Sequence, residues 1–392
     1  MPADGRLRAV VELARFDKGG LEKVVLDSTL ALRAAGIESV IVSVGPLGDL
    51  AAAAQAAGLR VAALPASGAE RAYGRLLDDV QPAVAVSHFS TLGYRLFARR
   101  GIPVVSFIHN VYAFLGEAAR RRFLADDRVV HRYIAVSPKA AEYAAARFGI
   151  DPARVVTIAN GLDVAEYERR AAAARPVARA SLGIAADDYV FLNVAAYNLH
   201  KGHYLMAAAM RRLLARRRDI RIVCVGNEVH PPHVAGLRAW LAEHGLDRHM
   251  LLPGYAARVE DLFAMADAFL LPSFIEGWSI AMNEAMVFGK PMVLTDTGGA
   301  SEVIEDDDTG ILVGNEYGPV TALDAPLLDR LAYETRDFRT AELLAAAMER
   351  LADAPGEWAA AGARGRAKLV QRYHLHTVAA HYAAALRAAA RS

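Results

Sequence analysis

The chain has 392 residues, of which 54% are hydrophobic and 23% charged, and its formal net charge is +1. This composition excludes a disordered chain, and the balanced charge provides no overall field that would attract nucleic acid. The length favours two domains, each large enough for its own core, and the single cysteine, Cys224, excludes an intramolecular disulfide.

Seven strand-like apolar runs alternate with helical segments in the first half of the chain, at residues 7–16, 39–44, 60–64, 83–86, 101–109, 133–137 and 155–158. Alternation at this pitch predicts an α/β domain with a parallel sheet covered by helices on both faces. Ligands bind to such sheets at the carboxyl ends of the strands. His88 and His109 both fall at strand ends. For His109 this position favours a site role, and for His88 it favours a structural hydrogen bond.

Two further features of the first half are candidates for binding. Gly19 and Gly20 separate the first strand from a helix, which suits close approach of backbone to a phosphate or sugar; a tight turn is the alternative. Arg120, Arg121 and Arg122 form a basic cluster that could contact a phosphorylated acceptor or an anionic membrane. An ordinary solvated helix face is the simpler interpretation of that cluster.

The expected domain boundaries follow from changes in composition. An Asn-Gly turn at 160–161 ends the first domain, residues 1–165, and an Arg/Ala-rich segment, 166–186, is interpreted as a partly helical linker. The second domain, 187–373, repeats the alternation with strands at 189–195, 220–225, 250–252, 268–271, 291–295 and 310–313. The C-terminal helix, within 374–392, has apolar residues at helical spacing and is expected to pack back toward the first domain.

The stretch from 272 to 302 holds the most suggestive pattern. Glu276 lies on a turn after a buried strand, and Glu284 follows after seven intervening residues in a helical segment. On one continuous helix these acids would lie roughly 80° apart, but Glu276 is expected just ahead of the helix, so both can address one ligand from the helix N-terminus. That end carries free N–H groups and partial positive charge, which suits a phosphate. A second glycine turn, Gly298-Gly299, follows the next strand.

With these motifs in order, the chain resembles the family 4 glycosyltransferases of the GT-B fold. The segments that carry the resemblance are EGWSIAMNEAMVFGKPMVLTDTGGASEVI, with its E-x7-E spacing, IAVSPKAAEYAAARFGIDPARVVTIANGLD, KGG and HKGH. The resemblance implies two Rossmann-like domains whose parallel sheets face a central cleft. It also implies a nucleotide-sugar on the C-terminal domain, an acceptor on the N-terminal domain, transfer with retention of anomeric configuration, and no essential metal or other cofactor.

Roles for individual residues come from the same resemblance. It implies catalytic roles for Glu276, His109 and Lys201, with Glu276 and His109 at the sugar and Lys201 at the diphosphate. It implies that the ribose hydroxyls bind Glu284, that the diphosphate binds the backbone of Ser279 and Ile280, and that the base lies near Gly254 and Tyr255. Gly20 and Gly299 complete the implied donor site. One departure concerns Ala196, where many members carry an arginine on the diphosphate. Tyr197, Asn198 or His200, or an arginine from the acceptor side, are candidates to replace it.

We therefore expect a hexosyltransferase that uses a nucleotide-diphosphate sugar and a hydroxyl of a glycan or lipid-linked acceptor in bacterial cell-surface polysaccharide synthesis. Two alternatives are a nucleotide-sugar epimerase on the same fold and a non-catalytic nucleotide- or carbohydrate-binding protein. No apolar signal segment or membrane span of about 18 residues is visible, which predicts a cytoplasmic protein; contact with the inner membrane face through the arginine cluster is a further hypothesis.

Overall fold

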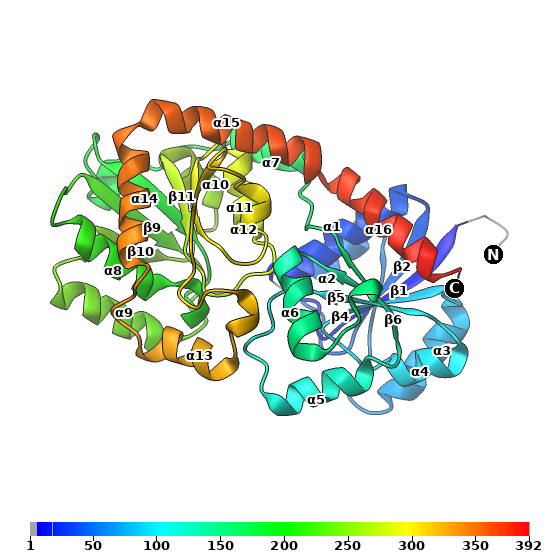
Figure 1. Cartoon of the computed structure of the whole chain (residues 1–392). Coiled ribbons are helices and arrows are strands. Elements are labelled where there is room, and N and C mark those ends of the chain that lie inside the picture. The colour runs from blue at the N-terminus through cyan, green and yellow to red at the C-terminus, as the bar shows by residue number, and fades with distance from the viewer. Residues whose placement is uncertain (1–5, 18, 392) are drawn as a thin grey trace. The chain divides into compact units, whose positions relative to one another are not determined.

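The chain forms two compact units in a computed structural model that describes residues 6–17 and 19–391 (Figure 1). Unit 1 comprises Met1–Asp163 and Arg372–Ser392, and unit 2 comprises Val164–Gln371. The segment expected as a linker, 166–186, therefore falls within unit 2. Helix α7 (Val164–Ala172), at the start of this segment, is held there because its Arg170 pairs with the buried Glu260 at 3.2 Å.

Unit 1 is built on a parallel sheet with strand order β3-β2-β1-β4-β5-β6-β7. Its strands are β1 (Leu7–Leu13), β2 (Ile37–Ser43), β3 (Arg60–Ala63), β4 (Val84–His88), β5 (Val104–Ile108), β6 (Val130–Ala135) and β7 (Val155–Thr157). The strand order reverses between β1 and β4, which are paired in parallel with Leu13 opposite His88. Such a reversal opens a crevice at the carboxyl ends of the two strands.

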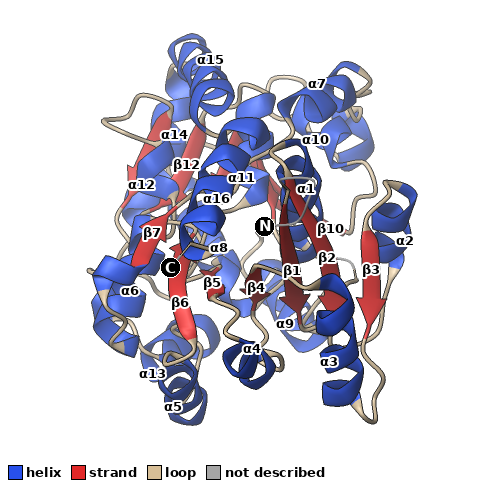
Figure 2. Cartoon of the chain, turned by 90° about the vertical axis from the view of Figure 1, so that its right-hand side faces the viewer, coloured by secondary structure: helices blue, strands red, loops and turns tan. Residues whose placement is uncertain are grey.

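Helices cover both faces of this sheet (Figure 2). One hydrophobic core joins the sheet to α1 (Gly20–Ala34), α2 (Asp49–Ala56) and the C-terminal α16 (Leu375–Ala389). The remaining helices of unit 1 are α3 (Ala69–Val80), α4 (Tyr94–Arg100), α5 (Glu117–Asp126) and α6 (Pro138–Phe148), with a short 3-10 turn at Pro152–Arg154. The C-terminal helix thus completes the core of the first unit, where the buried Tyr382 packs against Phe107 of β5.

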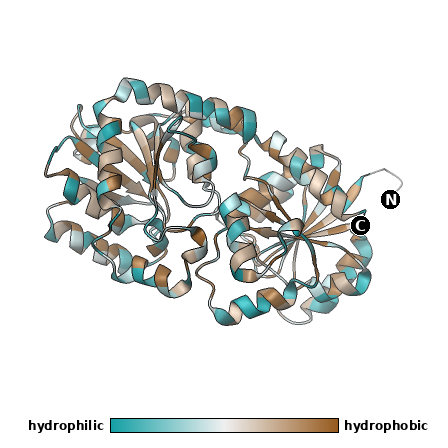
Figure 3. Cartoon of the chain, in the orientation of Figure 1, coloured by the Kyte–Doolittle hydropathy of each residue, from teal (hydrophilic) through white to brown (hydrophobic). Residues whose placement is uncertain are grey.

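Unit 2 has a second parallel sheet with strand order β10-β9-β8-β11-β12-β13. Its strands are β8 (Tyr189–Val194), β9 (Ile220–Val225), β10 (Met250–Gly254), β11 (Ala268–Leu271), β12 (Met292–Thr295) and β13 (Gly310–Val313). The order reverses between β8 and β11, so the loops after these two strands meet at the same edge. In both sheets the strands are predominantly hydrophobic, as buried parallel strands require (Figure 3).

The helices of unit 2 pack on the two faces of its sheet. Helices α8 (His203–Leu213) and α14 (Ala341–Asp353) pair on one face, whereas α10 (Val259–Met265) and α11 (Ile280–Val287) pack with α7 on the other. The remaining elements are α9 (Pro231–Glu243), α12 (Ala300–Val303), α13 (Ala325–Asp329) and α15 (Pro355–Arg372), three short 3-10 turns at Arg179–Leu182, Leu199–Lys201 and Val320–Ala322, and a π-helical turn at Arg330–Glu334. Among the described helices, none has both the length and the apolar character that crossing a bilayer needs.

The α/β class with two parallel sheets, predicted from the sequence, is confirmed, and each strand expected from an apolar run is present within a few residues of its predicted ends. Residues 315–340 also pack on unit 2, since Leu323, Leu328 and Phe338 are buried and the Phe338 ring lies 5.8 Å from that of Phe274.

Candidate active site

Lys201 is held in a short turn after β8. The Asn198 side chain accepts a hydrogen bond from the His200 N–H at 3.0 Å and so begins the turn, and Gly202 ends it in the left-handed region at φ +70°. A side chain at Gly202 would place its Cβ 2.0 Å from the carbonyl oxygen of Pro272. Glycine is therefore required for two reasons, its backbone conformation and the close approach of the loop that follows β11.

Glu276 lies on that second loop and faces Lys201. The Lys201 Nζ is 2.5 Å from Glu276 Oε1, and the Ser273 hydroxyl donates to the same oxygen at 2.9 Å. A backbone hydrogen bond from Phe274 N–H to the His200 carbonyl, at 2.8 Å, joins the two loops. The Glu276 residue is only 9% exposed. The two predicted residues are thus brought together where the strand order reverses, as a partly buried ion pair.

The Gly298-Gly299 turn packs directly against the Glu276 loop. Gly298 has φ +56°, and a Cβ there would lie 2.4 Å from the Gly277 carbonyl oxygen; a Cβ on Gly299 would lie 2.2 Å from the Trp278 ring. A cavity of about 10 Å³ lined by Glu276, Ser279 and Gly299 remains between them, room for about one water molecule. The glycine pair therefore has a packing role that its sequence pattern did not specify.

Helix α11 starts at this cavity. Ser279 is its N-cap residue but makes no side-chain capping hydrogen bond, so the first-turn N–H groups, beginning with Ile280, have no side-chain cap. Glu284 lies one turn further, half-buried, where burial raises its pKa to about 7 while the Arg170 charge and a hydrogen bond with Tyr167 oppose that rise. Neither Arg170 nor Tyr167 was singled out from the sequence, because they come from a helix more than 100 residues earlier.

The two residues expected near the base lie at the edge strand β10. Gly254 has φ +88° and ends the strand, and Tyr255 follows with 71% of its surface exposed. The buried Tyr197 supports this edge, since its hydroxyl donates to the Cys224 carbonyl at 2.5 Å and accepts from the Gly254 N–H at 3.3 Å. Gly254 and Tyr255 are therefore separated from the Lys201–Glu276 pair by the intervening strand β9.

The position of Ala196 is set by backbone packing. A Cβ on Gly226 would lie 1.9 Å from the Ala195 carbonyl oxygen and 3.0 Å from the Cα of Ala196, so the loops after β8 and β9 touch here. Of the three residues expected to replace a missing arginine, Tyr197 has its hydroxyl committed to the backbone and Asn198 caps a turn. His200 is half-buried beside Lys201, and burial and the Lys201 charge lower its pKa. His200 is thus a neutral hydrogen-bonding group next to the pair.

In unit 1 the structure brings the two predicted histidines into contact. His88 ends β4, His109 follows β5, and His88 Nδ1 lies 2.8 Å from His109 Nε2. Both rings stack on Phe107, with centroid distances of 4.4 Å and 5.3 Å respectively. Burial lowers the pKa of His109 to about 4 and also lowers the pKa of His88. Near pH 7 both imidazoles are neutral, so His109 can donate or accept a hydrogen bond but carries no charge.

Two further residues lie at the carboxyl end of β1. Glu12 is fully buried and accepts from the Ser90 hydroxyl at 2.5 Å and the Gly93 N–H at 2.9 Å, which fixes the loop after β4. In the sequence Glu12 is a single glutamate within an apolar run, a pattern that does not predict its contact with the loop after β4. Gly20 starts α1, and a Cβ there would meet no atom of residues 6–17 and 19–391 within 4 Å. Packing against these residues therefore does not explain glycine at this position; Lys18, two positions earlier, lies outside the described residues.

The three consecutive arginines do not form one uniform surface. The Arg120 Nε donates to the Arg147 carbonyl at 2.6 Å, and Arg121 pairs with Glu117 at 3.8 Å. Arg122 instead lines a pocket beneath α5. Arg120 also lies 3.5 Å from Glu117, so Arg120 and Arg121 share one carboxylate whereas Arg122 lines the pocket.

Comparison with known proteins decides the family. Residues 18–166 match the family described as Glycosyltransferase Family 4, and residues 174–324 match the family described as Glycosyl transferases group 1. The two matches follow one another along the chain and together take in both units.

The chain belongs to the family 4 glycosyltransferases.

Curated relatives of this family 4 glycosyltransferase agree with that assignment. A D-inositol 3-phosphate glycosyltransferase 2 from Catenulispora acidiphila is 28% identical over 261 residues, covering 61% of this chain and 60% of the relative. A D-inositol 3-phosphate glycosyltransferase from Gordonia bronchialis is 30% identical over 275 residues, covering 63% and 58%. The chain thus spans less than two thirds of these relatives. A third such protein, from Actinosynnema mirum, is 27% identical over 357 residues, covering 81% and 84%.

Solved structures show the same GT-B fold. The Anabaena protein HepE in complex with UDP-glucose matches with a TM-score of 0.79 at 17% identity, covering 98% of this chain and 100% of that one. A glycosyltransferase from Rickettsia africae matches with a TM-score of 0.77 at 15% identity, covering 98% and 99%. At these identities the similarity establishes the fold of the family 4 glycosyltransferase and not its substrates.

Proposed function

We propose that this protein is a retaining hexosyltransferase that moves a sugar from a nucleotide-diphosphate donor to a hydroxyl group of a glycan or lipid-linked acceptor. In the reaction the bond between the anomeric carbon and the diphosphate breaks, the acceptor oxygen bonds to that carbon on the same face, and the acceptor proton leaves with the diphosphate or with water. The Lys201–Glu276 pair supports this proposal most directly.

Each member of the pair has a charge opposite to the one that develops on the substrate atoms beside it during the reaction. A diphosphate bound at Lys201 would gain negative charge as the glycosidic bond breaks, and the ammonium would stabilise it. The Glu276 carboxylate, 2.5 Å from that ammonium, would then lie beside the anomeric carbon as it gains positive charge. The rigid contact at Gly202 fixes both groups before the substrate arrives.

The start of α11 suits the rest of the donor. The backbone N–H groups of the N-cap residue Ser279 and of Ile280, at a helix start without a side-chain cap, can bind the diphosphate. Glu284, one turn along, can accept hydrogen bonds from two ribose hydroxyls once it is ionised. The exposed Tyr255 offers a ring on which the base can stack. Charge on the leaving group is thus met by Lys201 and a helix N-terminus, and we propose that no metal is needed.

Names of similar proteins suggest where substrate tests should begin. The Anabaena protein HepE binds UDP and UDP-glucose according to its structures, so UDP-sugars are the first donors to test. The curated relatives are named for D-inositol 3-phosphate, so an inositol phosphate belongs in the acceptor panel beside glycans and lipid-linked sugars. A place in bacterial cell-surface polysaccharide synthesis is our proposal for the pathway.

The test is a donor screen followed by product analysis. Thermal unfolding with UDP-, GDP-, ADP- and dTDP-sugars should show selective stabilisation by one nucleotide. Proton NMR of the product made with that donor should then show the anomeric configuration of the donor, and EDTA should leave the rate unchanged. An epimerised donor in the absence of acceptor, or nucleotide binding with neither transfer nor hydrolysis, would refute the proposal in favour of an epimerase or a binding protein.

We also propose a cytoplasmic location with peripheral membrane contact through Arg120, Arg121 and Arg122. The exposure of Arg121 supports it, since its side chain is 73% exposed and its nearest carboxylate oxygen is 3.8 Å away. Co-sedimentation with vesicles of anionic lipid should be strong at low salt and weak at high salt, and Arg121→Glu should weaken it. Equal sedimentation with neutral vesicles, or none at low salt, contradicts this contact.

A further inference from the structure

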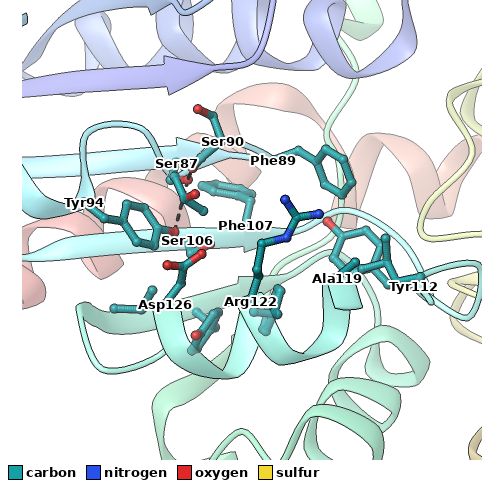
Figure 4. A pocket seen from close by; sticks show the side chains of 15 residues that line it. Ser87, Phe89, Ser90, Tyr94, Ser106, Phe107, Tyr112, Ala119, Arg122 and Asp126 are labelled. Carbon is teal, nitrogen blue, oxygen red and sulfur yellow. Dashed lines mark hydrogen bonds between the residues drawn. The ribbon is translucent and has the colours of Figure 1, made fainter. Parts of the chain in front are cut away.

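A pocket of about 280 Å³ lies in unit 1 between helix α5 and strands β4, β5 and β6 with the loop after β4 (Figure 4). Its walls are mainly apolar and aromatic, formed by Phe89, Phe107, Tyr112, Leu115 and Phe123. None of these residues belongs to the proposed donor site. The size suits a small molecule or one ring-sized part of a larger ligand, and not a folded oligosaccharide.

Helix α5 has an apolar stripe that faces the pocket. Leu115, just before the helix, and Ala119 and Phe123 within it recur every four residues and all line the pocket. No residue of this ten-residue helix is buried. An amphipathic helix normally buries such a stripe in the core. Phe123 stacks on Phe148 and Tyr133, at centroid distances of 4.8 Å and 6.1 Å. Leu115 and Ala119 face the pocket, where an apolar ligand would pack against them.

Polar groups at the inner end of the pocket are already paired with one another. The Tyr94 hydroxyl donates to Ser87 Oγ at 3.3 Å, and Ser87 Oγ donates in turn to the Ser90 carbonyl. Tyr133, another lining residue, donates to Asp127 Oδ1 at 2.7 Å. A polyol placed here would lose hydrogen bonds to water and find few replacements, which is costly, whereas a hydrocarbon ring needs none.

The mouth of the pocket differs from its interior. Arg122 extends from α5 at the mouth, toward Phe89 and Tyr112 (Figure 4). The Asp126 carboxyl, one turn along, also lines the pocket; burial raises its pKa, whereas a hydrogen bond with Thr91 and the Arg122 charge oppose that rise. A cation beside aromatic rings favours an aromatic over an aliphatic ligand and leaves the polar end of that ligand outside. The pocket thus has mainly apolar and aromatic walls, hydroxyl groups at its inner end that are paired with protein partners, and charged groups at its rim, a pattern that suits an amphiphile.

The pocket lies next to the histidine pair, because its lining residue Phe107, whose ring packs on Tyr382 in the core, also stacks on both His88 and His109. We propose that this pocket binds an apolar ring of the acceptor, so that the acceptor is an aryl-bearing alcohol or glycoside whose polar part lies at the rim. The term acceptor rests on the proposed transferase function, whereas the apolar class of the ligand rests on the pocket alone.

Calorimetric titration with two glucosides that differ only in the aglycone tests the proposal. Phenyl β-D-glucoside should bind the wild-type chain at least about tenfold more tightly than methyl β-D-glucoside, since only the former has a ring to bury. Ala119→Trp, which fills the pocket, should remove that preference. Ala118→Trp, on the neighbouring exposed position of the same helix, should keep it. Circular dichroism and thermal unfolding check that both variants fold.

Equal affinity of the wild type for the two glucosides overturns the proposal, and that comparison stands even if Ala119→Trp does not fold. Equal loss of the preference in both tryptophan variants overturns it as well. UDP binding and donor turnover by the wild type are measured separately. If UDP binding and donor turnover are absent while the phenyl preference holds, the transferase proposal fails and the pocket assignment stands. If UDP binding and donor turnover are present without a phenyl preference, the pocket assignment fails and the transferase proposal stands.

Discussion

Gly202→Ala tests the close contact between the loop after β8, which carries Lys201, and the loop after β11, which carries Glu276. The added Cβ would start 2.0 Å from the Pro272 carbonyl oxygen, so the loops must separate by about 1.4 Å to reach an ordinary 3.4 Å contact. The left-handed conformation at φ +70° costs about 1–2 kcal/mol for a non-glycine residue. Loss of the hydrogen bond between Phe274 and His200 adds about 0.5–1.5 kcal/mol. We expect a total destabilisation of about 2–4 kcal/mol once residual strain is included.

Gly245→Ala is the matched control. Gly245 lies in the same unit with φ +64°, and a Cβ there would meet no atom within 4 Å, so only the conformational cost of about 1–2 kcal/mol applies. Urea unfolding of both variants, followed on the transition of unit 2, measures the difference. Gly202→Ala should also lower sugar turnover by separating Lys201 from Glu276, while Gly245→Ala should not. Equal destabilisation by the two alanines would refute the close loop contact.

Three further predictions concern the donor site. Gly20→Ala should leave the free energy of unfolding unchanged or raise it by up to about 1 kcal/mol, because the added Cβ contacts none of the described residues. The same Cβ should reduce donor turnover, because it takes space that we propose the donor occupies; unchanged turnover would contradict this. Affinity for UDP-glucose should rise from pH 6 to pH 8, because Glu284, with a pKa of about 7, must ionise to accept two hydroxyl groups, and Glu284→Gln should show a flat profile in calorimetry. Tyr255→Ala should weaken the binding of UDP-glucose by about 1–3 kcal/mol without changing the unfolding temperature. Tyr333→Ala, at another exposed tyrosine, should leave the affinity for UDP-glucose unchanged.

The fold was largely predictable because its signals are local. Buried parallel strands read as apolar runs, so segments such as β9 and β11 could be located from a few residues each. The order of such runs also predicts which strand ends share an edge. That reasoning placed His88 and His109 at strand ends of the first domain, and the expected boundaries placed Lys201 and Glu276 in the second. The contacts within each pair, at 2.8 Å and 2.5 Å, come from the structure.

Other features depend on contacts between distant segments and left no pattern in the sequence. Arg170 and Tyr167 reach Glu284 only because α7 packs against α11, and the same packing draws the expected linker into unit 2. Glu12 was hidden in an apolar strand, since its partners on the loop after β4 lie about 80 residues away. The pocket under α5 arises from the spacing between a helix and a sheet, which amino-acid pattern alone does not specify.

The most direct measurement of the proposed chemistry is the initial rate of sugar transfer by Lys201→Ala and Glu276→Ala beside the wild type. Loss of a charge-assisted contact of about 1.5–3 kcal/mol corresponds to at least about a tenfold to 150-fold lower rate, and more if the contact strengthens in the transition state. Both variants should remain folded by circular dichroism and lose transfer by that factor or more. Near-normal turnover in both would show that the pair at the ends of β8 and β11 does not carry the reaction.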